Sequence, residues 1–190
     1  MSDTSQEVVR AYHARTKHRF DAYAEGPGQL DWDEQPAAFR HYSGAPLLEL
    51  PLAADRFERC YGQLAISPDN LPAPDLNSLG ALLELAFGLS AWKSWGPNRW
   101  ALRCNPSSGN LHPVEAYVLA GHFPGLGDGL HHYDPENHAL EGRALVGPET
   151  GAPWLAVGLS SIMWREAWKY GGRAFRYCQL DVGHAVGALA

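Results

Sequence analysis

The stretch RCNPSSGNLHP, residues 103–113, lies between a tryptophan-rich segment and a run typical of a β-strand. Its small hydroxyl side chains and its glycine allow the backbone to approach a ligand closely. Ser107, Ser108 and Asn110 offer hydrogen-bond donors and acceptors, which match the edge of a uracil-like ring. Arg103 can bind a phosphate or a carboxylate. Taken alone, the same chemistry also fits an ordinary helix cap made of serine and asparagine.

Regular elements are predicted on the C-terminal side of this stretch. Residues 115–120, 130–133 and 154–161 are typical of strands bounded by turn residues. From Ala174 to the last residue, apolar side chains keep helical spacing, which predicts a helix. Strands followed by a helix indicate an α+β fold.

The N-terminal side contains two predicted helices separated by an irregular arm. Thr4 and Glu7 form a capping box, which predicts a helix that reaches the basic residues 15–19. A second helix is predicted from an N-cap at Asn77 or Ser78 to a stop at Gly88. Its apolar positions are Leu79, Leu82, Leu83, Ala86 and Phe87. Residues 24–55 contain too many prolines and glycines for a long regular element. We therefore divide the chain into a helix and arm, 1–55, and a partial domain, 56–190.

Composition excludes several classes of function. A length of 190 residues with 45% apolar content suits one globular domain, and a net charge of -6 disfavours nucleic-acid binding. Cys60, Cys104 and Cys178 are odd in number and widely spaced, so we expect no disulfide framework, no zinc knuckle and a reducing cytoplasm. No stretch is apolar enough to span a membrane, and there is no signal peptide. The nine histidines form no HExxH motif, and we predict no metal site.

The segment PSSGN, residues 106–110, followed by His112 and Pro113, resembles the Pro-Ser-x-x-Asn-x-Gln-Pro segment of the nitroreductase superfamily. In that family the segment lines FMN. The resemblance implies that Pro106, Ser107, Ser108 and Asn110 bind FMN. His112 stands where the family usually has glutamine, and we include it and Arg103 as candidate FMN ligands.

A second segment, WREAWKYGGRAFRY at 164–177, resembles the Lys-Tyr region of the SagB/ThcOx-type dehydrogenases within this superfamily. Oxidising an azoline to an azole removes a ring proton together with a hydride, so the site needs a base beside the flavin. Lys169 and Tyr170 are the predicted catalytic residues. The alternative for Lys169 is an exposed lysine at the start of a helix.

The resemblance also implies a fold: a mixed central sheet flanked by helices, incomplete at the C-terminus, in a homodimer or a tandem pseudo-dimer. The Arg-Arg-Ser stretch that clamps the FMN phosphate in this family has no counterpart in residues 46–78. The family's last helix, strand and basic residue are absent after Ala190. We therefore expect the chain to be the N-terminal part of a longer or tandem protein.

The predicted function is FMN-dependent dehydrogenation of azoline rings in peptide-derived substrates. One alternative is a flavin-free structural or peptide-binding half of a tandem protein. Another is an NAD(P)H-dependent reductase of nitro compounds or quinones. The sequence contains no dinucleotide fingerprint that would decide between the two redox activities.

Overall fold

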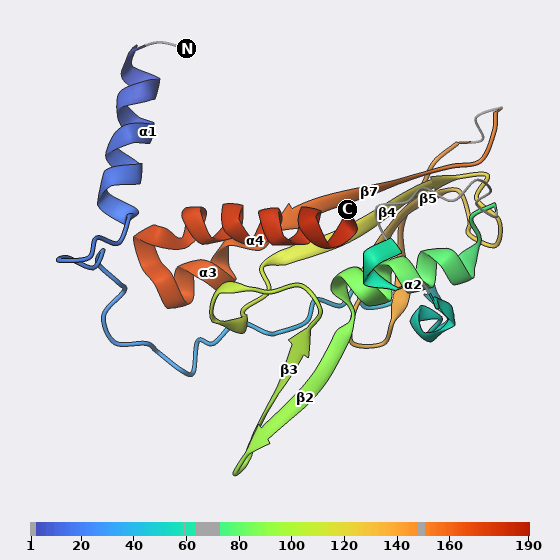
Figure 1. Cartoon of the computed structure of the whole chain (residues 1–190), viewed down its shortest axis with the longest axis horizontal. Coiled ribbons are helices and arrows are strands. Elements are labelled where there is room, and N and C mark those ends of the chain that lie inside the picture. Colours follow the sequence, from blue (N-terminus) through green and yellow to red (C-terminus); the bar gives the residue numbers. More distant parts are fainter. Residues whose placement is uncertain (1–2, 59, 64–72, 148–150) are drawn as a thin grey trace.

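The computed structural model describes residues 3–58, 60–63, 73–147 and 151–190. It has the predicted α+β architecture, with helices packed on a five-stranded sheet (Figure 1). The helices are α1 (Asp3–Thr16), α2 (Leu76–Phe87), α3 (Met163–Tyr170) and α4 (Ala174–Leu189). The strands are β1 (Leu47–Glu49), β2 (Leu89–Trp95), β3 (Asn98–Arg103), β4 (Val114–Gly121), β5 (Gly129–Asp134), β6 (Ala139–Leu145) and β7 (Trp154–Ser161). Among these described helices, none is long and apolar enough to cross a membrane.

The main sheet has the strand order β1-β6-β5-β4-β7, and each of these neighbouring pairs is antiparallel. The expectation of a mixed sheet is therefore wrong for the described strands. The physical reason lies in the connections, because β4, β5 and β6 follow one another through short turns that can join only antiparallel neighbours. Strand β6 itself was not predicted.

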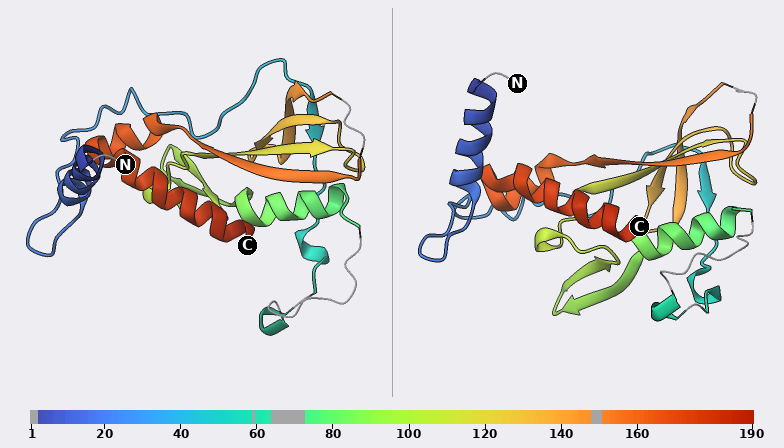
Figure 2. Two further views of the ribbon diagram at one scale, coloured as in Figure 1. Left: turned by 90° about the horizontal axis from the view of Figure 1, so that it is seen from above. Right: turned by 45° about the horizontal axis from the view of Figure 1, so that its top comes forward.

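The hydrophobic core lies between one face of the sheet and helices α2 and α4, which Figure 2 shows on the same side of the sheet. Val114, Ala116 and Val118 alternate along β4 and point to this side, where they meet Leu83 of α2 and Ala185 of α4. The predicted apolar positions Leu79, Leu83, Ala86 and Phe87 of α2 are buried in this core, whereas Leu82 is exposed.

The predicted end of α2 is confirmed and its predicted start is corrected. Gly88 caps the C-terminus by donating its N–H to the Glu84 and Leu83 carbonyls. The N-cap is Asp75 instead of Asn77 or Ser78. The Asp75 carboxylate accepts from the Ser78 N–H at 2.9 Å, and the Asp75 N–H donates to the Ser78 hydroxyl at 2.7 Å. This reciprocal pair lengthens the helix at its start.

The tryptophan-rich segment before residue 103 is a β-hairpin, where a plain connection was expected. Strands β2 and β3 pair only with each other and extend away from the rest of the molecule (Figure 1). Every residue of β2 after Leu89 is exposed. Because neither face of this strand packs on the core, the usual alternation of apolar and polar residues is absent.

The second face of the main sheet carries a buried ionic network. His132 of β5 is fully buried, with Nδ1 2.7 Å from the Glu141 carboxylate and Nε2 2.8 Å from the Glu115 carboxylate. Arg165 of α3 donates to the other Glu115 oxygen at 2.5 Å. Burial alone would raise the pKa of Glu115, but the hydrogen bond with His132 and the charge of Arg165 outweigh burial and lower that pKa.

The same network holds the arm on the sheet. The Tyr42 N–H donates to Glu141 at 2.8 Å, and the Tyr42 ring meets His132 edge-on with centroids 5.1 Å apart. Arg165 Nε donates to the Ala37 carbonyl at 3.0 Å. The irregular arm predicted from its prolines and glycines is thus fixed by polar contacts.

We predict that His132→Ala strongly destabilises the fold. The substitution leaves Glu115 and Glu141 buried without their shared partner, and breaking a buried charge pair costs about 3–5 kcal/mol. Urea unfolding at pH 7 measures the loss. His131→Ala is the control, because the neighbouring His131 points to the opposite side of β5 and makes one exposed hydrogen bond, to the Gly127 carbonyl. Equal losses in the two variants would contradict the assigned role of the network.

Candidate functional site

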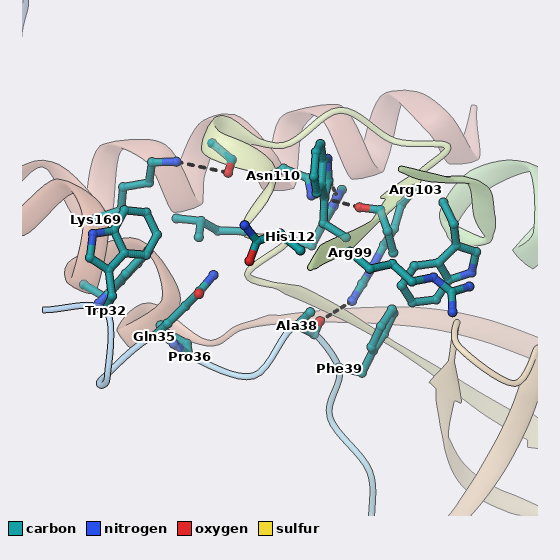
Figure 3. Close-up of a pocket in the computed structure, with 17 residues that line it drawn as sticks. Trp32, Gln35, Pro36, Ala38, Phe39, Arg99, Arg103, Asn110, His112 and Lys169 are labelled. Atoms are coloured by element: carbon teal, nitrogen blue, oxygen red, sulfur yellow. Dashed lines mark hydrogen bonds between the residues drawn. The ribbon is translucent and has the colours of Figure 1, made fainter. Parts of the chain in front are cut away.

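A cavity of about 1010 Å³ lies between the arm, the β2–β3 hairpin, the loop after β3 and helix α3. Figure 3 shows Lys169 and Trp32 at one end and Arg99 and Phe39 at the other, with His112 between them. Three segments that are distant in the sequence therefore build one site: the arm, the hairpin with the loop that follows it, and helix α3. This convergence makes it the candidate ligand site.

Tryptophan side chains form much of the cavity wall. Trp92 and Trp100 of the hairpin keep 41% and 39% of their surface exposed. Trp32 and Trp168 meet edge-to-face at 5.3 Å on the other side, and Trp168 Nε1 donates to the Asp31 carbonyl at 2.7 Å. Such a wall suits a planar aromatic ligand.

The Ser107 side chain and the Ser108 backbone N–H point into the protein, where both bind Asp181 of α4. Ser107 Oγ donates to one Asp181 oxygen at 2.5 Å, and the Ser108 N–H donates to the other at 3.1 Å. Ser107 Oγ also accepts from the His112 N–H at 2.8 Å. Asp181 is fully buried, so these bonds fix the loop from behind.

The loop turns through left-handed backbone positions at Gly109, Asn110 and His112, with φ of 65°, 60° and 48°. A Cβ atom added at Gly109 would lie 2.6 Å from the Tyr170 hydroxyl and 2.9 Å from Lys169 Nζ. Glycine is therefore required here by conformation and by space. Its absence of a side chain allows both predicted catalytic groups to converge on the loop.

Asn110 and His112 are joined to each other at the cavity wall. The amide Nδ2 of Asn110 donates to the Ala101 carbonyl at 2.8 Å, and its Oδ1 lies 3.1 Å from His112 Nε2. Burial, with the charges of Arg103 and Arg165, lowers the pKa of His112 to about 3. The imidazole is therefore neutral at neutral pH and donates from Nε2. Its Nδ1 is buried and has no hydrogen-bond partner among the described residues.

Arg103 joins the loop to the arm. Its Nη2 donates to the Ala38 carbonyl at 2.8 Å, and its guanidinium lies over the Phe39 ring at 5.3 Å. Burial lowers the pKa of Arg103 to about 10, partly opposed by the charge of Glu115, so the side chain remains a cation at neutral pH. It supplies positive charge to the cavity wall.

Lys169 and Tyr170 end helix α3 beside the loop. Lys169 Nζ donates to the Gly109 carbonyl at 3.3 Å. The Tyr170 ring packs on Tyr177 with centroids 4.2 Å apart, and burial raises the pKa of its hydroxyl. Lys169 thus lies in the last turn of α3 and not at the start of a helix.

The predicted site residues divide into two groups. Arg103, Asn110, His112 and Lys169 line the cavity. The others lie behind or beside its lining: Pro106, Ser107, Ser108 and Tyr170. The structure therefore brings both motifs to one place, while their individual roles toward FMN stay predictions.

Sequence reasoning missed two buried acids behind the site, Asp181 and Glu166. Glu166 of α3 is fully buried, and neither carboxylate oxygen has a hydrogen-bond partner among the described residues. Burial and the nearby charge of Asp181 raise the pKa of Glu166 to about 8, against a smaller opposing effect of Lys169. An acid on an amphipathic helix is normally exposed, so the sequence offered no signal for either residue.

Comparison with known proteins gives a consistent assignment. No family model matches the chain. It is 28% identical to the trifolitoxin-processing protein TfxF of Rhizobium leguminosarum bv. trifolii, over 97% of this chain and 72% of the relative. It is also 28% identical to a candidate nitroreductase of Methanocaldococcus jannaschii, over 58% of this chain and 59% of the relative.

One solved structure supports the fold. A candidate nitroreductase from Anabaena variabilis superimposes with a TM-score of 0.68 and 26% identity over 96% of this chain. The chain spans only 37% of that structure's length. The Escherichia coli microcin synthetase McbBCD complex, bound to truncated pro-MccB17, matches with a TM-score of 0.48 and 19% identity, over all of this chain and 78% of that one. The resemblance to nitroreductases predicted from the two motifs is confirmed, and the fold is nitroreductase-like.

We predict that the melting temperature of Glu166→Gln, compared with that of the original chain, increases as the pH rises. The folded pKa of about 8 lies above the ordinary value of 4.5. The protonated Glu166 of the original chain therefore contributes its full share of the folding stability at a pH below 4.5. That share is lost progressively as the pH rises toward 8. Glutamine cannot ionise and loses nothing over this range. Melting temperatures at pH 5 and pH 8 measure the difference.

The expected gain of Glu166→Gln at pH 8, relative to pH 5, is about 3 °C or more. Glu7→Gln is the control, because Glu7 is exposed on α1. A difference between Glu166→Gln and the original chain that stays constant from pH 5 to pH 8 would contradict a protonated Glu166.

Proposed function

We propose that the chain is part of an FMN-dependent oxidoreductase that dehydrogenates azoline rings in peptide-derived substrates. One observation carries the proposal: residues of two motifs, Asn110 with His112 and Lys169 with Tyr170, converge on Gly109 beside one aromatic cavity. The similarities to nitroreductases and to a trifolitoxin-processing protein support an oxidoreductase or peptide-modifying role.

The residues present fit FMN. The cavity volume of about 1010 Å³ is ample for a ring system with a side chain, and the partly exposed Trp100 can stack on the ring. The Arg99 guanidinium already lies over the Trp92 ring, at 4.0 Å. The exposed Asn110 beside the turn can reach the polar ring edge, and the buried His112 Nδ1 is an acceptor still without a partner. Arg99 and Arg103 supply positive charge for an anionic ligand.

When bound, FMN supplies a hydride acceptor, which no side chain can provide. The chain's own contribution is to remove the ring proton. The Lys169 amine, in its neutral form, can accept the ring proton at Nζ, and the Gly109 carbonyl at 3.3 Å orients the amine. The Tyr170 hydroxyl lies beside the same glycine, where it positions Lys169 or relays the proton.

We infer the peptide nature of the substrate from the arm. The likeness to TfxF extends over 97% of this chain, so it includes the arm as well as the domain. The arm contributes Trp32, Gln35 and Phe39 to the cavity. A substrate entering the cavity would therefore contact the arm, which is a suitable place to recognise the residues that flank an azoline.

We predict that the chain binds FMN and that Trp100→Ala weakens binding about 5- to 100-fold, because base-like rings gain about 1–3 kcal/mol by stacking on an aromatic side chain. Quenching of flavin fluorescence measures the affinity. Trp95→Ala is the matched control, since Trp95 lies in the same hairpin but is 80% exposed and does not line the cavity. Its affinity should stay within about twofold of the original. Failure of the original chain to bind FMN would favour the flavin-free alternative.

We further predict that Lys169→Ala, in the protein that contains this chain, slows azoline oxidation by about 10²- to 10⁴-fold, the usual contribution of a positioned base. FMN should remain bound, because other groups hold it. Absorbance at the flavin band and azole formation by mass spectrometry separate the two effects. A rate within about threefold of the original would make Lys169 structural, and loss of FMN would make it a cofactor ligand.

A further inference from the structure

A second, smaller cavity of about 230 Å³ lies where the end of α1 meets the turn between α3 and α4. Figure 2 shows this end of α1 beside the start of α4 in both views. Arg15 and Thr16 line the cavity from α1, Glu25 and Gly26 from the arm, and Gly172 and Arg173 from the turn. The predicted FMN ligands and catalytic residues do not line it.

Positive charge in this cavity is poorly compensated. Among the described residues, neither Arg15 nor Arg173 forms an ion pair within 4.0 Å. The Arg15 guanidinium lies over the Tyr12 ring, with 5.7 Å to the ring centroid. Glu25 lines the same cavity but pairs with neither arginine. Two arginines against one glutamate that pairs with neither of them leave an excess of positive charge, which favours an anionic ligand.

The hydrogen bonds of Arg173 show an excess of donors. Its Nη1 lies 2.6 Å from His18 Nε2, while the Ala24 N–H points to His18 Nδ1 at 3.0 Å. A neutral imidazole accepts at only one nitrogen, so one of these two contacts sets a donor against a donor. Arg173 Nε is also buried and lacks a partner among the described residues. A hydrogen-bond acceptor from outside the chain would satisfy the unpaired N–H donors of Arg173.

Glycines keep the space in front of both guanidinium groups open. A Cβ atom added at Gly172 would lie 3.1 Å from Arg15 Nη1, and one at Gly26 would lie 3.4 Å from Arg173 Nη2. Side chains at these positions would compete with a ligand for the arginine donors. Gly26 and Gly172 therefore contribute only backbone to the cavity wall, and the two arginines contribute its charged donors.

We infer that this cavity binds a phosphate-type oxyanion through Arg15 and Arg173. Guanidinium groups bind such oxyanions with paired hydrogen bonds, and two groups from different segments match a doubly charged ligand. The cavity has room for one phosphate group, either free phosphate or the phosphate end of a larger molecule. Lys169 and Tyr170 do not line this cavity, although the Arg173 guanidinium lies over the Tyr170 ring at 5.5 Å.

Titration with inorganic phosphate at constant ionic strength, followed by ³¹P NMR, tests the inference. The original chain should show saturable binding, and Arg15→Gln and Arg173→Gln should each weaken it at least about tenfold, the effect of losing one charged hydrogen bond. Arg10→Gln is the matched control, because it removes the same charge from an exposed position of α1 that does not line the cavity. Arg15 is exposed as well, so its variant is expected to fold, which the melting temperature verifies.

Absence of saturable binding, or equal weakening in Arg10→Gln and Arg15→Gln, would overturn the site. Competition then identifies the source of the phosphate group. Displacement of phosphate by FMN but not by riboflavin assigns the site to a nucleotide phosphate, and displacement by neither assigns it to free phosphate. Equal displacement by riboflavin and FMN would also overturn the inference, because riboflavin has no phosphate.

Discussion

The buried contact of His132 with Glu115 and Glu141 is the interaction on which the site depends. Glu115 also binds Arg165, and Arg165 in turn donates to the His112 carbonyl at 2.6 Å. One chain of buried polar contacts therefore joins strands β4, β5 and β6 to helix α3 and to the loop after β3. His132, Glu115, Glu141 and Arg165 are all buried, so each is stable there only while its partners are in place. The network fixes the position of α3, and with it the position of Lys169.

A second constraint acts from the other side of the loop. Asp181 of α4 binds Ser107 and Ser108, while Arg165 of α3 binds the loop carbonyl at His112. The loop is thus held between two helices, and its left-handed turn at Gly109 leaves room for the ends of Lys169 and Tyr170. This explains why a serine-rich stretch and a Lys-Tyr segment, far apart in the sequence, act as one unit.

Local periodicity predicted the parts of the fold that pack on the core. The observed bounds of β7 match the predicted ones at both ends, and those of α2 and α4 match apart from the N-cap of α2. These predictions succeeded because one face of each element is apolar and the other is not. The β2–β3 hairpin has no such contrast and was missed. The sequence predicted which residues lie at the site but not which way their side chains point. Whether Ser107 points to a ligand or into the protein depends on Asp181, 74 residues away, and sequence patterns contain no information on such a pair.

Glu166 shows how burial determines the charge of this region. It lies one turn before Tyr170 and close enough to Asp181 that ionisation of both acids would place two negative charges behind the same loop. Asp181 accepts two hydrogen bonds, and Glu166 accepts none from the part of the chain that the structure describes, so the negative charge is better stabilised on Asp181. A protonated Glu166 therefore allows Asp181 to remain the acceptor that holds Ser107 and Ser108. The shape of the cavity wall thus depends on an acid that contacts neither the cavity nor the loop by any hydrogen bond of its own.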